Sequence, residues 1–435
     1  MPRTWSRRSL LVVAMGPLAA GLLACQRAGE SPVPEKPAAA RRETAAAESG
    51  EPAKPKPRSQ LPPAEATAAP TTQPTPQPAQ PSVEPSPPAV LTPAQPAVAT
   101  RLPGVIAQPR GLTAVNEFAD ETRVGSLFQD ATYQNANLAG LTFRTSWADL
   151  EPGDGQFKWQ KLDEVFQKAE ANGKWVRLIL VPGFGTPAWA LAGAQSATFP
   201  IKYGRGQGTP LPLPLPWDQT YLSRWFSFLR AVAQRYGSRP SFRMIAAAGP
   251  TSVSSEMSLP NTEPDVEQWR RLGYTPDKYV GAWRQTFAAY ADIFPGQYFS
   301  LALYPGLPIP DRKARDETRR QVASIGIENY PSRFALQTSG LNANKGEDGA
   351  GAQLVREASA KVLVGFMMST SASRRTAEMC DSCRTAPDAL QAAIKKGLDE
   401  GARYLEIYEP DVLDPAMQPV LASAAHSLAG PAGAA

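Results

Sequence analysis

The sequence has a single histidine, His426, among its 435 residues. This excludes a zinc site built from several histidines, and it speaks against a serine–histidine catalytic triad. Any acid–base chemistry would therefore fall to carboxylates, tyrosine or lysine. We expect His426 itself to be a surface or packing residue near the C-terminus.

Cysteine is also scarce, with three residues in the whole chain. Cys380 and Cys383 form a Cys-x-x-Cys pair, which can be either a redox-active motif or a structural disulfide. A zinc site would need two further ligands and none are visible, so we expect no metal. An even pair in an oxidising compartment favours a local disulfide that fixes a loop.

Long hydrophobic runs are missing too. The N-terminal apolar run Leu10–Leu23 follows a basic start and is short for a transmembrane helix. The tetrad Leu22-Leu23-Ala24-Cys25 resembles the lipobox of bacterial lipoproteins. The resemblance implies a signal peptide over residues 1–25, lipidation of Cys25 and a membrane anchor. Gln26 then favours the outer membrane or cell surface of a bacterial envelope over the inner membrane. An ordinary signal peptide with an incidental cysteine is the alternative.

The net charge bears on the partners of the protein, and the proline-rich composition bears on which residues can fold. The net charge of +5 is small for this length, so no nucleic-acid partner is expected. Residues 26–109 are dominated by Pro, Ala, Thr, Gln and Ser and have too few apolar residues to form a core. We expect a disordered Pro/Ala-rich linker there and a folded domain over residues 110–430.

The folded part alternates β-rich and helical runs. Leu141–Trp147, a helical run from Gln160 to Ala171 and Trp175–Pro182 together read as a βαβ unit, which requires parallel strands. The β-rich runs are Gly111–Asn116, Leu141–Trp147, Trp175–Pro182, Phe242–Gly249, Tyr298–Pro305, Phe334–Gly340, Val362–Ser369 and Arg403–Tyr408. The clearest helical runs are Gln160–Ala171, Gln219–Tyr236, Pro276–Ile293, Pro387–Glu400 and Pro415–Ala429.

This pattern predicts an α/β fold, a (β/α)8 TIM barrel. An open doubly wound sheet is the alternative, but no glycine-rich phosphate loop follows an early strand. No cofactor motif is visible, and we expect no cofactor.

Two motifs in the first βαβ unit carry a resemblance to a known clan. Arg144-Thr145-Ser146-Trp147-Ala148-Asp149-Leu150-Glu151-Pro152 and Pro187-Ala188-Trp189 resemble clan A glycoside hydrolases, nearest to β-galactosidase-like and cellulase-like barrels. The resemblance implies an acid/base glutamate after strand four, usually preceded by Asn, and a nucleophilic glutamate at the end of strand seven. It also implies that Arg144 supports the nucleophile.

The chain departs from that pattern at both carboxylates. Glu256 follows Ser255 rather than Asn and lies several residues beyond strand four, and Val362–Ser369 contains no carboxylate. Period-two alternation on strand eight instead turns Glu406 into the barrel, with Glu409 starting the next loop.

These residues predict an extracytoplasmic glycosidase acting on a β-linked carbohydrate. The candidate catalytic residues are Glu256 as general acid and Glu406 or Glu409 as nucleophile or base. Strands four and eight lie opposite one another, so this pairing suits inversion or no reaction. The alternative for Glu406 is a buried carboxylate paired with Arg144 or a tyrosine. The candidate substrate-binding residues at strand ends are Arg144, Trp147, Trp189, Tyr304, Gln337 and Tyr408.

Two other readings stay open. One is a non-catalytic carbohydrate-binding barrel that has lost its strand-seven nucleophile. The other is an envelope scaffold whose barrel binds a protein.

Overall fold

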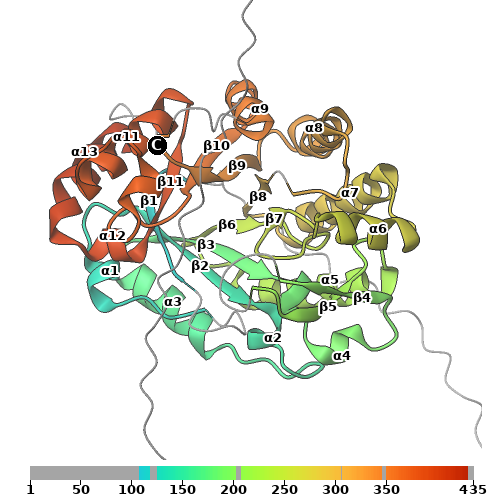
Figure 1. Ribbon diagram of the computed structural model, residues 1–435. Helices are drawn as coiled ribbons and strands as arrows, with labels where there is room; N and C mark the ends of the chain where they lie inside the picture. The colour runs from blue at the N-terminus through green and yellow to red at the C-terminus, as the bar shows by residue number, and fades with distance from the viewer. Residues whose placement is uncertain (1–106, 118–124, 202–206, 305, 345–348, 430–435) are drawn as a thin grey trace, which may run out of the picture. The chain divides into compact units, whose positions relative to one another are not determined.

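The computed structural model describes residues 107–117, 125–201, 207–304, 306–344 and 349–429 (Figure 1). The chain divides into residues 1–92 and residues 93–435, and everything described belongs to the second unit. The predicted signal peptide, the lipidation site Cys25 and almost all of the predicted linker lie outside the described residues.

Eight parallel strands close into a barrel, which confirms the predicted fold (Figure 1). Each strand pairs with the next in the chain, and the last pairs with the first through Gly111↔Tyr404 to Val115↔Tyr408. The strands are β1 (Gly111–Val115), β2 (Gly140–Ser146), β3 (Trp175–Val181), β6 (Phe242–Ala246), β8 (Tyr298–Leu303), β9 (Phe334–Leu341), β10 (Leu363–Met368) and β11 (Tyr404–Tyr408).

Helices surround the barrel and bury their apolar faces against the outside of the sheet. The longer ones are α3 (Gln160–Ala171), α5 (Gln219–Tyr236), α7 (Pro276–Ile293), α8 (Arg312–Asn329), α9 (Ala350–Ala358), α11 (Ala386–Asp399) and α13 (Gln418–Ala429). Capping side chains define several starts: Asp218, Thr275, Asp311 and Thr385 each accept a backbone N–H of the first turn. The predicted helix Pro415–Ala429 begins with a separate 3₁₀ turn, η2 (Pro415–Met417).

Further helices and a two-stranded ribbon follow several of the barrel strands. The remaining helices are α1 (Asp130–Gln134), α2 (Trp147–Leu150), η1 (Gly183–Gly185), α4 (Ala188–Leu191), α6 (Glu263–Arg271), α10 (Thr376–Met379) and α12 (Glu409–Leu413). An antiparallel ribbon, β4 (Ser196–Pro200) and β5 (Pro210–Pro214), follows β3. Within the described parts of the chain, no helix combines the length and apolar character that crossing a bilayer requires.

The barrel interior is layered. An apolar layer at the amino-terminal end contains Trp175, Met244, Tyr298, Ala335, Leu363 and Tyr404. Gly365 makes room for it, because a Cβ atom there would lie 2.2 Å from the ring of Tyr404. A polar layer lies above, and the carboxyl ends of the strands form the mouth. Active residues of such barrels lie at this end.

Candidate active site

The polar layer of the barrel is centred on Glu406, which has no solvent exposure. Its Oε1 accepts hydrogen bonds from the Thr142 hydroxyl at 2.7 Å and from Nη1 of the equally buried Arg177 at 2.5 Å. Its Oε2 accepts one from Gln337 Nε2 at 2.8 Å. Both carboxylate oxygens are therefore occupied by fixed donors in a closed layer. Glu406 belongs to the barrel interior rather than to the catalytic mouth, and its partner is Arg177 rather than Arg144.

Gln337 is part of the same network. It is 1% exposed, and its Oε1 accepts a hydrogen bond from the Tyr404 hydroxyl at 2.7 Å. Arg177 continues the network to Ser300 Oγ at 2.9 Å. Because these donors and acceptors satisfy one another, Gln337 is not available to a sugar, which corrects its assignment to substrate binding.

Glu409 also has a structural position. Its Oε1 accepts the backbone N–H of Gln129 at 2.8 Å and the hydroxyl of Thr132 at 2.7 Å. These are the residues at the start of α1, so Glu409 caps that helix from across the chain. This contact uses one of the two carboxylate oxygens, and the role of Glu409 as nucleophile or base stays a prediction.

Trp147 lies in the core outside the barrel, with no exposure. Its ring packs on Trp189, Trp225 and Phe228 at centroid distances of 5.3–5.7 Å, and its Nε1 donates to Glu151 Oε2 at 2.8 Å. A ring covered on all sides cannot stack on a sugar, so the substrate-binding role expected for Trp147 is corrected to packing.

Trp189 packs edge-on against Trp147 and is half-buried. Its Nε1 donates to the backbone carbonyl of Glu151 at 3.0 Å, which ties α4 to the loop after α2. The indole N–H of Trp189 is thus bonded within the protein. The prediction that Trp189 binds substrate now concerns only the exposed part of its ring.

Glu256 lies in a short strand, β7, that continues strand four after an interruption. β6 pairs with Tyr298–Ser300 of β8, residues 247–255 then leave the sheet, and β7 (Glu256–Met257) pairs with Ala302 and Leu303 of the same strand. Glu256 therefore stands at the carboxyl end of strand four, although the sequence places it well beyond. Ser254, just before it, has φ 56°, a left-handed conformation that is uncommon outside glycine and concentrates at functional sites.

Burial raises the pKa of Glu256, and the Ser339 side chain and the positive charge of Arg144 counteract part of this effect. A carboxyl group whose pKa is raised at the mouth of a barrel suits a general acid. Ser339 was missed in the sequence, although the alternation that turns Gln337 inward on β9 also turns Ser339 inward.

Arg144 and Tyr408 lie in the same surroundings as Glu256 and Ser339, and the four residues form one cluster at the mouth. Arg144 is fixed to the end of strand one, because its backbone N–H donates to Asn116 Oδ1 at 2.6 Å and its Nη2 to the Asn116 carbonyl at 3.3 Å. Burial raises the pKa of the half-buried Tyr408, Arg144 opposes this, and the negative charge of Glu256 adds to it. Of the predicted site residues, the structure thus brings together Glu256, Arg144 and Tyr408.

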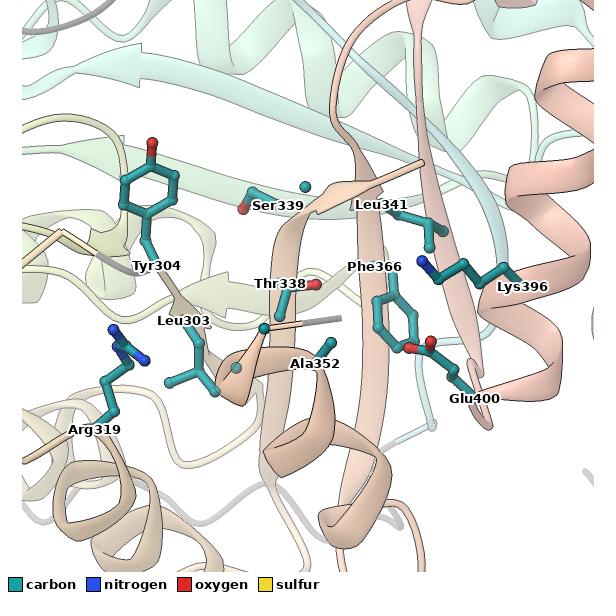
Figure 2. A pocket seen from close by; sticks show the side chains of 13 residues that line it. Leu303, Tyr304, Arg319, Thr338, Ser339, Leu341, Ala352, Phe366, Lys396 and Glu400 are labelled. Atoms are coloured by element: carbon teal, nitrogen blue, oxygen red, sulfur yellow. The ribbon is translucent and has the colours of Figure 1, made fainter. Parts of the chain in front are cut away.

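Tyr304 lies beside this cluster, at the rim of a pocket of about 230 Å³ between the ends of β8–β10 and the surrounding helices α8, α9 and α11 (Figure 2). Ser339 also lines the pocket, so the pocket borders the residue that contacts Glu256. Arg319 and Tyr304 lie on one side, and Lys396 and Glu400 on the other (Figure 2). The pocket is large enough for one small ligand, since it equals roughly eight waters at ~30 Å³ each.

The loop after β10 is closed by a disulfide between Cys380 and Cys383. Asn344, after β9, holds this loop by accepting the Asp381 N–H at 2.5 Å and donating to the Glu378 carbonyl at 3.1 Å. Across the described residues, no group of three histidine, cysteine, aspartate or glutamate side chains could hold a metal ion.

Comparison with known protein families supports the resemblance of the barrel to glycoside hydrolases. Residues 129–295, less than half of the chain, match the model of a glycoside hydrolase family described as beta-galactosidase. None of the curated proteins is similar enough in sequence to count as a match.

The solved structures that the chain matches include several xylanases. Xylanase B from Clostridium stercorarium F9 has 13% identity and a TM-score of 0.40, with 69% of this chain and 85% of that chain covered. Xylanase 10B from Thermotoga petrophila RKU-1, in complex with xylobiose, has 12% identity and a TM-score of 0.41, with 68% and 81% covered. The strand pairing and the family match show that this chain carries a glycoside hydrolase-like (β/α)8 barrel and resembles clan A glycoside hydrolases.

Proposed function

We propose that the protein is a glycosidase that cleaves a β-linked carbohydrate, with Glu256 as the general acid. One observation carries this proposal: Glu256 stands at the carboxyl end of strand four with its pKa raised by burial. That is the place at which clan A enzymes, which the chain resembles, hold their acid/base. A protonated carboxyl group there can give its proton to the leaving glycosidic oxygen.

Arg144, Tyr408 and Tyr304 supply the remaining contacts in this proposal. Arg144 lies close enough to Glu256 for its charge to influence that carboxyl group, and Tyr408 shares the same surroundings. Hydroxyl and guanidinium groups can bind sugar hydroxyls, and tyrosine rings can stack on sugar faces.

A non-catalytic carbohydrate-binding barrel is the second candidate. One observation favours it: strand seven, β10, has the sequence LVGFMM and offers no carboxylate to the mouth. Arg144, Tyr304 and Tyr408 would serve a binding protein equally well. The two candidates differ in whether Glu256 transfers a proton.

Glu256→Gln should abolish most hydrolysis of substrates with poor leaving groups. We expect kcat/KM for phenyl β-glycosides and β-linked disaccharides to fall about 10²–10⁴-fold, because an amide cannot donate the proton. Dinitrophenyl β-glycosides should lose far less, since dinitrophenolate leaves without protonation. Initial rates over a panel of β-glucosides, β-galactosides and β-xylosides measure both effects.

The matched control is Glu267→Gln, an exposed carboxylate in α6, farther along the same segment, paired with Arg270 at 2.9 Å. It should hydrolyse every substrate at the wild-type rate. Wild-type protein that binds sugars in calorimetry but releases no phenol from any glycoside would support the binding-barrel candidate and reject the enzyme.

The pH profile gives a further test of Glu256. A general acid works only when protonated, and a raised pKa keeps it protonated to higher pH than an ordinary glutamate. The kcat/KM for phenyl β-glycosides should therefore fall as the pH rises through the raised pKa of Glu256. The wild type should lack this fall with dinitrophenyl β-glycosides, because their leaving group needs no proton. An equal fall with phenyl and dinitrophenyl substrates would assign the basic limb to another group.

We propose that the barrel is tethered to the bacterial cell envelope through a lipid on Cys25, at the outer membrane or cell surface. The support is the sequence Leu22-Leu23-Ala24-Cys25 after an apolar run. Incorporation of labelled palmitate into the wild type and its loss in Cys25→Ser would support the anchor. Equal labelling of both proteins would reject it.

A further inference from the structure

Strand four is interrupted just before Glu256. Ala246 is in register with Ser300 of β8, and Glu256 is in register with Ala302 of the same strand. Residues 247–255 leave the sheet between these two pairs, while β8 continues without a break. The point at which Glu256 rejoins the sheet therefore depends on how residues 247–255 are held.

Leaving the sheet takes buried backbone groups away from their neighbours on β8. The Ala247 N–H still donates to the Ser300 carbonyl of β8 at 2.8 Å. The next residue, Ala248, is fully buried. Buried backbone N–H and C=O groups need hydrogen-bond partners. For Ala248 and Gly249, these partners come from outside the sheet.

Three aromatic side chains of the surrounding helices supply the partners. The Tyr290 hydroxyl, on α7, accepts the Ala248 N–H at 3.0 Å, and Trp225 Nε1, on α5, donates to the Ala248 carbonyl at 2.7 Å. The Tyr221 hydroxyl, also on α5, donates to the Gly249 carbonyl at 2.6 Å. None of the three side chains is exposed. Tyr221, Trp225 and Tyr290 together form an aromatic anchor for the start of the segment.

The chain turns at Gly249, directly against this anchor. Gly249 has φ 149°, a conformation that a side chain would strain, and a Cβ atom there would lie 3.4 Å from the Trp225 ring. Further along, the Ser252 carbonyl accepts the Phe184 N–H, from the loop after β3, at 2.9 Å. The Ser252 N–H and hydroxyl donate to the Ser258 carbonyl at 3.0 and 2.8 Å. The segment is thus held at its start by the aromatic anchor and farther along by the loop after strand three.

Glu256 enters the mouth from this segment. Ser300 points into the barrel, because its hydroxyl accepts a hydrogen bond from the interior Arg177 at 2.9 Å. Alternation along β8 turns Ala302 to the same side. Glu256 is paired with Ala302, so its side chain also faces the interior, and it remains partly exposed. A slip of the segment by one residue would turn the Glu256 carboxyl away from the mouth.

We propose that the aromatic anchor holds Glu256 in place for proton transfer, so that Tyr221, Trp225 and Tyr290 are positioning residues. This inference rests on the proposed function. The three side chains act through the backbone of residues 248 and 249, which they hold from the helices outside the barrel. A general acid must lie within hydrogen-bond distance of the glycosidic oxygen. A displacement of about 1 Å can lower the rate by about 100-fold.

The test compares Tyr290→Phe and Tyr221→Phe with Tyr236→Phe, each of which keeps the ring and removes one buried hydroxyl. Tyr236 is a matched control, because it lies on α5, has no exposure and donates its hydroxyl to Asp163 of α3 at 2.8 Å. In Tyr290→Phe and Tyr221→Phe, we expect kcat/KM for phenyl β-glycosides to fall about 10–100-fold. Dinitrophenyl β-glycosides should keep nearly the wild-type rate, since their leaving group needs no proton. Tyr236→Phe should keep both rates.

A second readout needs no substrate. The pKa of the Glu256 carboxyl can be followed by ¹³C NMR of protein labelled in its glutamate side chains, with Glu256→Gln to identify the signal. Burial raises this pKa in the wild type. A segment released from the anchor should expose the carboxyl to water, and its pKa should fall toward that of an ordinary glutamate in Tyr290→Phe and Tyr221→Phe but not in Tyr236→Phe.

Two results would overturn the inference. One is an equal loss for phenyl and dinitrophenyl β-glycosides in Tyr290→Phe and Tyr221→Phe, which would indicate general damage to the fold. The other is an unchanged pKa of Glu256 in both variants. A wild type that hydrolyses no glycoside would reject the proposed function, and the pKa comparison would still decide whether the anchor positions the carboxyl.

Discussion

Replacing Arg177 with methionine is expected to lower the free energy of unfolding by about 3–5 kcal/mol. The substitution removes the guanidinium that binds Glu406 at 2.5 Å and Ser300 at 2.9 Å, and it leaves a carboxylate without its counter-charge inside the barrel. Neither Arg177 nor Glu406 is exposed, so water cannot replace the lost donor. Urea unfolding followed by circular dichroism measures the change.

An exposed ion pair provides the control. Arg235 and Asp163 are 2.6 Å apart, but their side chains are 46% and 37% exposed. Arg235→Met should therefore cost less than about 1 kcal/mol, the usual range for a surface pair. The double variant Arg177→Met, Glu406→Leu should regain much of the lost stability, because it removes the unpaired charge as well. Equal losses for Arg177→Met and Arg235→Met would contradict the role assigned to the buried pair.

The buried pair also bears on the proposed role of Glu256 at the mouth. The Arg177–Glu406 pair joins β3 to β11 across the interior, and Gln337 of β9 joins the same carboxylate. Three strands are thus fixed to one another directly below the layer that contains Arg144, Ser339 and Tyr408. A rigid floor lets side chains at the strand ends keep their positions.

Local sequence patterns were sufficient for the fold. All eight β-rich runs became barrel strands, and Gln160–Ala171, Gln219–Tyr236 and Pro276–Ile293 became helices with the predicted limits. These elements have either a continuous apolar run or an apolar stripe at helical spacing. The helix α8 was not identified, because its sequence RKARDETRRQVASIGIEN is polar over most of its length. It is helical because a few residues, among them Val322 and Ala323, pack on the barrel.

The candidate site was harder to predict, because its residues meet through pairings between strands. The alternation of side chains along Tyr404–Tyr408 correctly predicted that Glu406 points into the barrel. Its ion-pair partner Arg177 lies on another strand, so the local sequence could not identify it. Residues 247–255 interrupt strand four, so counting from Phe242 could not place Glu256 at the end of that strand.

Replacing Trp147 with alanine should lower the free energy of unfolding by about 3–5 kcal/mol, as expected for a buried tryptophan. The change opens a cavity among Trp189, Trp225 and Phe228 and removes the indole that donates to Glu151 at 2.8 Å. Trp147→Phe should lose less, because it keeps a ring in the cavity while giving up the hydrogen bond. Urea unfolding of both variants measures the loss.

The same two Trp147 variants decide between packing and sugar binding at this position. Because the ring is fully covered by protein, the affinity for any sugar that the wild type binds should be unchanged once the comparison is made on folded protein. Calorimetric titration at a temperature well below the melting point of Trp147→Ala makes that comparison. A stable Trp147→Ala protein with weakened sugar binding would instead show that the ring contacts the ligand. Unchanged affinity with reduced stability would exclude Trp147 from sugar recognition and assign its ring to packing.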